Sequence, residues 1–269
     1  MNPYLKFVQQ IEAEVKSAKD IPLGGIVPAV QRAAADAPTV LLFSPHPDDE
    51  CITGLLPLRL MREAGMKIVN VPITFGSNIE RQPRRAAELR NVCGFLGWEI
   101  FQRPEGFHAF EKADVVGTLR TVQPDIIFVP HAKDWNSRHI STHFLVMDAL
   151  AEMDKSFTCV VIETEFWGAM DDPNLMIEGD AWTVADLVAA LSLHVGEVAR
   201  NPYHLSLPAW MQDNVRRGGE LVGGQGGAVP DFMFATLYRL SRWENRKLVR
   251  TLEKGLMMGR NDDLKTIFL

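Results

Sequence analysis

The sequence predicts an α/β fold in which a mostly parallel sheet carries helices on both faces. Short apolar runs alternate along the chain with longer stretches of helical periodicity. Two of the apolar runs, 39–43 and 125–130, end in clusters of polar residues. Strands that alternate with helices form parallel sheets, whose ligands bind outside the carboxyl ends of the strands. We therefore expect the functional residues in these two clusters.

The periodicity of each stretch predicts its secondary structure. Residues 4–18 repeat apolar side chains at spacings of three and four, which predicts an amphipathic helix before the first strand. Residues 21–38 contain several Pro and Gly and predict a loop or a broken helix. The expected strands are 39–43, 67–74, 98–101, 125–130 and 158–164, and the expected helices are 52–64, 81–96, 113–122, 140–153 and 184–199.

We expect a single domain over residues 1–269, with a core of about 36–200 and an irregular C-terminal appendage at 201–269. We find no internal repeat and no low-complexity linker. The appendage is rich in glycine and aromatic residues, and its run at 223–227 lacks the Lys-Ser/Thr of a phosphate-binding loop. The first helix and this tail can pack on the core or on a second copy, so a homo-oligomer remains open.

The composition of the chain limits the classes of partner and the cellular compartment that we expect. The formal net charge of −6 argues against non-specific binding to nucleic acid or to an anionic membrane. No apolar run is long enough to cross a bilayer, and the N-terminus lacks a signal-peptide pattern. Three widely spaced cysteines without a CxxC indicate a reducing compartment. We therefore expect a cytoplasmic protein.

The first polar cluster, 44–50, contains one His and three acids directly after a predicted strand. A catalytic zinc ion takes three protein ligands and leaves one position for water. His46 and Asp49 can supply two of them, and a His of the second cluster can supply the third. Asp48, next in sequence to Asp49, can then act as the base for the water.

Here the sequence resembles a known family. The run 44–50 after an apolar strand is similar to the signature of the PIG-L/LmbE-like family of zinc-dependent N-acetylglucosaminyl deacetylases. The resemblance covers roughly residues 39–200 and implies a Rossmann-like three-layer sandwich with Zn²⁺ as cofactor. It also implies Asp48 as the general base and His46 and Asp49 as zinc ligands.

The second motif of that family, Asp-x-His-Pro-Asp-His, is similar to residues 134–139. An alignment without gaps implies His139 as the third zinc ligand. His143 remains a rival, because an i, i+4 pair of His can bind one metal on a helix face. The chain departs from the motif at Asn136, where the family usually has a His that assists as an acid or stabilises the oxyanion. An amide can donate to an oxyanion but cannot protonate the leaving amine, which leaves Asp48 to act as base and acid.

Four further residues are expected near the substrate. Asn78 follows the strand at 67–74 and should open onto the same crevice. The resemblance implies a sugar or phosphate contact for Arg85, whose alternative is an exposed helix pair with Glu88. His131 either lines the pocket or caps its strand, and Trp167 either stacks on a sugar or belongs to the core.

The expected function is metal-dependent removal of an acetyl group from a small N-acetylated amino sugar of the N-acetylglucosamine type. A metal-activated water attacks the amide, with Asp48 as its base. Two other functions remain open, a Mg²⁺-dependent phosphate-handling enzyme and a non-catalytic sugar-binding α/β domain. Magnesium favours oxygen ligands and would leave His46 and His139 unexplained.

Overall fold

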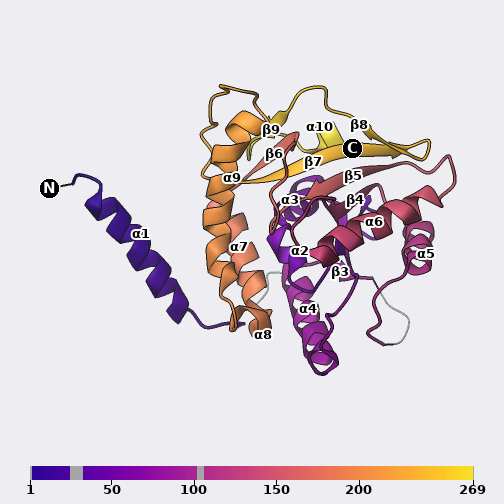
Figure 1. Cartoon of the computed structure of the whole chain (residues 1–269), viewed down its shortest axis with the longest axis horizontal. Coiled ribbons are helices and arrows are strands. Elements are labelled where there is room, and N and C mark those ends of the chain that lie inside the picture. Colours follow the sequence, from indigo (N-terminus) through magenta and orange to yellow (C-terminus); the bar gives the residue numbers. More distant parts are fainter. Residues whose placement is uncertain (1, 25–32, 102–105, 269) are drawn as a thin grey trace.

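The computed structural model describes residues 2–24, 33–101 and 106–268. These residues form one nine-stranded sheet with helices on both faces (Figure 1). The strand order is β3-β2-β1-β4-β5-β7-β6-β9, and β8 pairs with β7. The strands are β1 (Thr39–Ser44), β2 (Lys67–Pro72), β3 (Glu99–Ile100), β4 (Ile126–Pro130), β5 (Cys159–Thr164), β6 (Leu175–Gly179), β7 (Phe234–Glu244), β8 (Lys247–Arg250) and β9 (Leu256–Met258).

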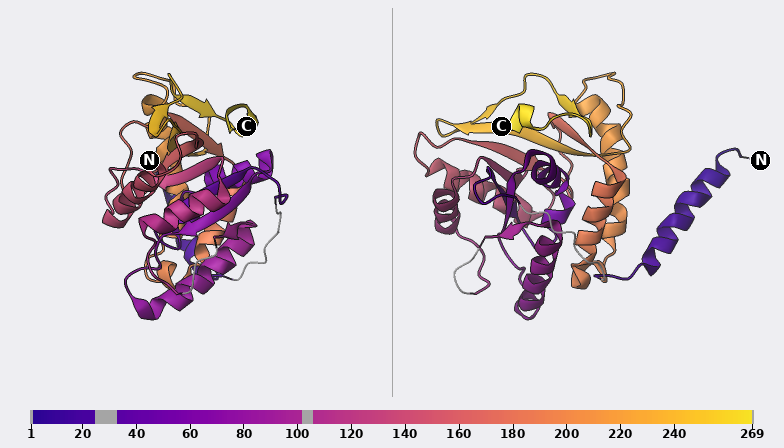
Figure 2. Two further views of the ribbon diagram at one scale, coloured as in Figure 1. Left: turned by 90° about the vertical axis from the view of Figure 1, so that its right-hand side faces the viewer. Right: turned by 180° about the vertical axis from the view of Figure 1, so that it is seen from behind.

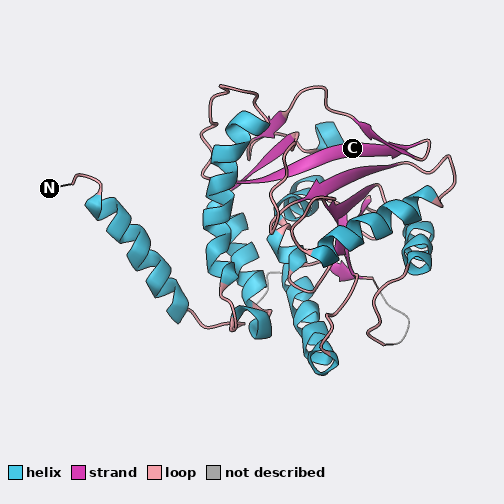
Figure 3. Ribbon diagram, in the orientation of Figure 1, coloured by secondary structure: helices cyan, strands magenta, loops and turns pink. Residues whose placement is uncertain are grey.

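The helices come between and after these strands (Figure 3). They are α1 (Leu5–Ser17), α2 (Asp49–Ile52), α3 (Leu55–Ala64), α4 (Gln82–Leu96), α5 (Lys112–Val122), α6 (Ser137–Ala151), α7 (Ala181–Ser192), α8 (Val195–Val198), α9 (Leu207–Leu221) and α10 (Lys265–Phe268). Three short 3-10 turns are η1 (Ala18–Asp20), η2 (Ile79–Arg81) and η3 (Tyr203–Ser206).

The predicted parallel sheet is confirmed for β1 to β5, which pair in parallel. The chain runs outward from β1 through β2 to β3, and then returns to the other side of β1 at β4. The strand order therefore reverses between β1 and β4. This is the place where open α/β sheets leave a crevice at the carboxyl ends of their strands.

Two apolar layers cover the sheet, because successive side chains of a strand point to opposite faces. Val40 and Leu42 of β1 pack in the cluster that contains side chains of α3, α4 and α7. Leu41 and Phe43 pack in the other cluster, with side chains of α5 and α6. The sandwich of helices, sheet and helices confirms the expected three-layer α/β class.

The C-terminal region differs from the irregular appendage that we expected. It contains α9 and three strands, and β7 inserts between β5 and β6 and runs antiparallel to both. Arginines of the C-terminal region interrupt the apolar run that predicts a buried strand. Arg239 of β7 forms a bidentate ion pair with Glu163 of β5, at 2.6 and 2.8 Å, and Arg217 of α9 pairs with Glu165 at 2.6 Å. These pairs satisfy acids at the end of β5 and attach the C-terminal region to the sheet.

The ends of the chain and two helices show smaller differences. The predicted N-terminal helix is present as α1, but it extends away from the rest of the chain and has no buried residue (Figures 1 and 2). Of the loop expected at 21–38, residues 25–32 lie outside the described residues. The helix expected at 52–64 is divided into α2 and α3, and the helix expected at 184–199 into α7 and α8. Within the described ranges, no helix has the length and apolar character needed to span a membrane.

Asp180 provides a test of how α7 is anchored. Its Oδ1 accepts the Thr183 N–H at 2.7 Å and caps the first turn of α7. Burial alone would raise the pKa of Asp180, but the hydrogen bond from Thr183 lowers it. We expect Asp180→Ala to lower the free energy of unfolding by about 1 kcal/mol at pH 7, and Asp180→Asn to retain most of it.

The pH dependence follows from the direction of that shift. A carboxyl whose folded pKa is lowered stabilises the protein above its unfolded pKa and loses this contribution as the pH falls through the folded value. The difference in free energy of unfolding between wild type and Asp180→Ala should therefore decrease when the pH falls below about 4. Urea unfolding at a series of pH values measures this difference. A constant difference down to pH 2 would contradict a role for the charged cap.

Candidate metal centre and active site

The ends of β1 and β4 bring three potential metal ligands together. His46 follows β1, Asp49 begins α2, and His139 lies in the first turn of α6, which follows β4. Their ligand atoms all lie within 4.8 Å of one another. Asp49 Oδ2 lies 3.4 Å from His46 Nδ1 and 3.3 Å from His139 Nε2. The fold therefore joins the two polar clusters of the sequence at the place where the strand order reverses.

His139 has the surroundings that a metal ligand requires. Its Nε2 is buried and makes no hydrogen bond within the described part of the chain, which is unfavourable for a polar atom. Its other ring nitrogen, Nδ1, lies 3.5 Å from Asp134 Oδ2. Metal-binding histidines commonly use their second nitrogen in this way. Together with His46 and Asp49, the donor set fits a divalent ion with one position left open.

The electrostatics of this cluster favour a positive charge. Burial alone would raise the pKa of Asp49, but the imidazoles of His139 and His46 hold it well below its usual range. Burial would likewise lower the pKa of His139, but the carboxylates of Asp49 and Asp134 raise it to about 10. A buried carboxylate is stable only beside a compensating charge. A proton on an imidazole can supply that charge, and so can a bound cation.

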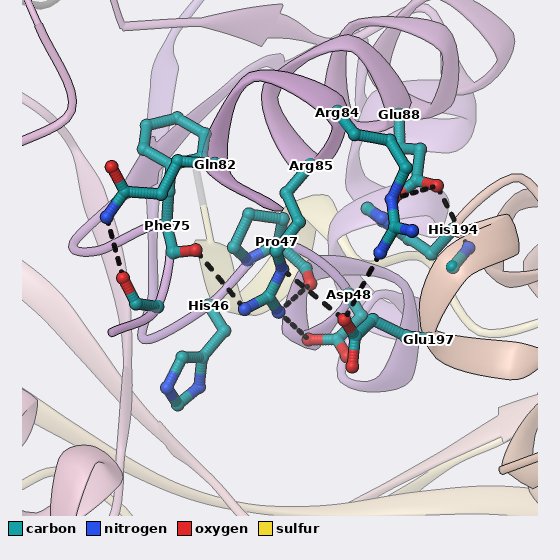
Figure 4. Close-up of polar contacts among 12 residues, drawn as sticks. His46, Pro47, Asp48, Phe75, Gln82, Arg84, Arg85, Glu88, His194 and Glu197 are labelled. Atoms are coloured by element: carbon teal, nitrogen blue, oxygen red, sulfur yellow. Dashed lines mark hydrogen bonds and ion pairs between the residues drawn. The ribbon is translucent and has the colours of Figure 1, made fainter. Parts of the chain in front are cut away.

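Asp48 adopts a strained backbone conformation that its neighbours hold in place. Its φ of 125° lies in a region that residues other than glycine rarely adopt. Its N–H donates to Glu50 Oε2 at 2.9 Å, and Glu50 Oε1 lies 2.6 Å from His194 Nε2. On the other side, Arg85 Nη2 donates to the Pro47 carbonyl at 3.0 Å (Figure 4). The turn is thus fixed by residues of α4 and of the segment that follows α7.

The Asp48 carboxylate lies apart from the three potential ligands. Its Oδ2 accepts a hydrogen bond from the Tyr203 hydroxyl, and its Oδ1 lies 3.9 Å from Arg85 Nη2. Burial and the negative charge of Asp49 raise the pKa of Asp48 to about 7, against the lowering influence of His194, Arg85 and Tyr203. A carboxyl that titrates near neutral pH can accept and return a proton during a reaction.

Arg85 supports the loop that carries the motif. Its side chain is 11% exposed, and it donates to the carbonyls of Pro47 and Phe75 (Figure 4). The exposed Arg85–Glu88 pair, the structural alternative from the sequence, is wrong. Instead, Arg84 Nε lies 3.4 Å from Glu88 Oε1, because Arg84 is one turn away from Glu88 on the same face of α4.

His131 and Trp167 lie on two loops that contact each other. His131 is buried at the end of β4, with its Nε2 2.9 Å from the Gly168 carbonyl. Trp167, the neighbour of Gly168, is 41% exposed and its ring centroid lies 5.9 Å from that of Tyr203. Because Tyr203 contacts Asp48, Trp167 lies at the rim of the site.

The two asparagines both cap helical turns. Asn136 Oδ1 accepts the Arg138 N–H at 2.9 Å at the start of α6. Asn78 Oδ1 accepts the Glu80 N–H at 3.1 Å at the exposed start of η2. Each cap uses the amide oxygen, so the amide N–H groups are the donors that these residues can offer to a ligand.

His143, the rival ligand, lies in a different environment. Its Nδ1 is 2.9 Å from the Pro130 carbonyl and 3.6 Å from Glu163 Oε1. It is absent from the groups of described residues whose ligand atoms could share an ion, whereas His139 belongs to one. Burial lowers the pKa of His143, which keeps its ring neutral.

Sequence reasoning missed the supporting residues of this site. Glu50 was part of the motif, and its spacing alone did not reveal that it would bind the Asp48 amide. His194 is fully buried, and its ring forms a second close group with Glu50 and Cys51. Tyr203 lies in a tail without a motif, so no local signal pointed to it.

Comparisons with known proteins agree with this geometry. The family model described as "PIG-L: GlcNAc-PI de-N-acetylase" matches residues 41–150. Over these residues, the chain is similar to the PIG-L family. The expected enzyme class, a deacetylase that hydrolyses a non-peptide C–N bond, is confirmed at the level of that family. No curated protein sequence matches the chain.

Several solved structures have a fold similar to that of this chain. A conserved protein from Thermus thermophilus has 17% identity and a TM-score of 0.56, over 74% of this chain and 92% of that one. An N,N'-diacetylchitobiose deacetylase from Pyrococcus horikoshii has 16% identity and a TM-score of 0.56, over 87% of this chain and 92% of that one. A 4-carboxy-2-hydroxymuconate hydratase from Pseudomonas putida has 16% identity and a TM-score of 0.56, over 76% and 95%. At these identities the likeness concerns the fold alone.

The metal site can be tested by metal content. We expect the purified wild type, after dialysis against a divalent metal, to retain about one ion per chain when measured by plasma mass spectrometry. His139→Ala should lose the ion, because it removes one of three ligands. His143→Ala should retain it, because His143 faces Pro130 and Glu163 instead. Loss of metal in the second variant and retention in the first would reassign the third ligand.

Proposed function

We propose that this protein is a zinc-dependent deacetylase that hydrolyses the acetamide of an N-acetylated amino sugar. The observation that carries the proposal is the close approach of His46, Asp49 and His139 beside a separate carboxylate, Asp48. The family description supports an N-acetylglucosamine-type substrate. The N,N'-diacetylchitobiose deacetylase of similar fold is consistent with a saccharide.

The donor set supports zinc over magnesium. Two of its three members are imidazoles, which suit zinc, whereas magnesium prefers carboxylate, carbonyl and water oxygens. The same preference argues against the alternative of a magnesium-dependent phosphate enzyme. When bound, the ion would polarise the amide carbonyl and lower the pKa of a water molecule towards neutrality.

The protein's own residues account for the remaining steps. Asp48 accepts a proton from the attacking water while the new C–O bond forms. Asn136 can donate an amide N–H to the carbonyl oxygen as negative charge develops there. Asp48 then returns the proton to the nitrogen as the C–N bond breaks, which releases acetate and the free amine. The burial of Asp48, which raises its pKa, favours both the uptake of the proton and its return.

Trp167 is the residue best placed to contact the sugar itself. It is partly exposed at the rim, and Phe166 lies against it with ring centroids 4.8 Å apart. Aromatic side chains offer apolar faces to the C–H groups of a pyranose ring. Arg85, by contrast, is occupied by backbone carbonyls, so its contribution to the site is support of the motif loop.

Activity should be tested by acetate release from a panel of N-acetylated sugars, with and without a metal chelator. We expect chelator-sensitive release, and a loss of about 100- to 10,000-fold in kcat for Asp48→Asn with unchanged metal content. Asp171→Asn, which alters an exposed acid paired with Lys133, is the matched control. Full activity in Asp48→Asn would remove the base assignment. If the protein released acetate from none of the sugars but hydrated an unsaturated carboxylic acid, it would catalyse a different reaction from the one proposed.

Asn136 can be tested separately from its capping role. Asn136→Asp keeps a good helix cap but removes the amide donors, so stability should be retained while kcat falls about 100- to 1,000-fold. Asn136→Ala should lose both activity and about 1 kcal/mol of stability. Steady-state kinetics and urea unfolding separate the two effects. An Asn136→Asp variant with wild-type kcat would show that the amide N–H contributes nothing to the reaction.

A further inference from the structure

The fixed backbone of Asp48 does not by itself fix its carboxylate. The Glu50 and Arg85 contacts both hold the peptide group between Pro47 and Asp48, and neither of them involves a hydrogen bond to the Asp48 carboxylate. Arg85 Nη2 lies 3.9 Å from Asp48 Oδ1, beyond hydrogen-bond distance. Among the described side chains, the one that donates a hydrogen bond to this carboxylate is Tyr203.

Tyr203 is itself held rigidly. Its N–H donates to the Asn201 carbonyl at 2.7 Å, and its residue is 9% exposed at the start of η3. Its ring contacts Trp167 on one side and belongs to the larger apolar cluster. A donor fixed in this way restricts the orientation of its acceptor more than a mobile surface side chain would.

We propose that Tyr203 is a positioning residue that orients the Asp48 carboxylate for proton transfer. The hydroxyl occupies Oδ2, so Oδ1 is left to accept the proton of the attacking water. This inference rests on the proposed function, because it assigns Asp48 the role of base. It also gives the C-terminal region a part in the chemistry, since Tyr203 lies outside residues 41–150.

The test removes the hydroxyl and keeps the ring. Tyr203→Phe should lower kcat about 10- to 100-fold, the range that a misplaced catalytic group can cost, with KM and metal content unchanged. In the Asp48→Asn background, the same change should have no further effect on kcat, because Tyr203 acts through Asp48. Tyr238→Phe, which removes another buried tyrosine hydroxyl, bonded to Leu56 N–H and the Thr53 carbonyl, should leave kcat unchanged.

Each contrary outcome has a distinct meaning. Wild-type kcat in Tyr203→Phe, or an equal fold-loss in both backgrounds, would overturn the positioning role while the proposed function stands. If the wild type releases no acetate from any sugar, the proposed function fails. The interaction between Tyr203 and Asp48 can then be measured from free energies of unfolding. The stabilities of wild type, Tyr203→Phe, Asp48→Asn and the double variant should be non-additive. Additive effects would show that the two side chains do not interact and would overturn the proposal.

Discussion

A buried negative charge between two imidazoles is the constraint on which this site depends. The Asp49 carboxylate lies close to His46 from the end of β1 and to His139 from α6. Removing a carboxylate from water is costly unless opposite charge or donors surround it. The sheet meets this requirement by placing the ends of β1 and β4 side by side, so the same crossover that builds the fold also assembles the donor set.

Adjacent residues of the motif perform different tasks because the backbone between them is unusual. The positive φ of Asp48 separates its carboxylate from that of Asp49, although the two acids are neighbours in sequence. Such strain persists only where surrounding structure over-determines it. Here Glu50, His194 and Arg85 hold the turn. The site is therefore a property of several elements, and the short motif marks only its centre.

The sequence was most informative where chemistry and periodicity coincide. Buried parallel strands produce continuous apolar runs, and the polar residues that end them belong to the crevice, so β1, β4 and the three potential ligands could be identified together. Partners distant in sequence could not, because no periodicity links Tyr203 or His194 to Asp48. The strand β7 was missed for another reason. Its Arg239 is compensated by Glu163 of β5 and by Asp172, whereas an arginine without such partners indicates a solvated segment.

The position of β7 has a consequence for biosynthesis. It pairs with β5 on one side and β6 on the other, yet it is made long after both. Until it leaves the ribosome, β5 is an open edge of the sheet and β6 has neither of its strand partners, β7 and β9. Unpaired strands of this kind promote association with other chains. The central strands can pair early, but β7 can join β5 to β6 only after translation is nearly complete. Shielding by a chaperone would therefore matter most for this late interval.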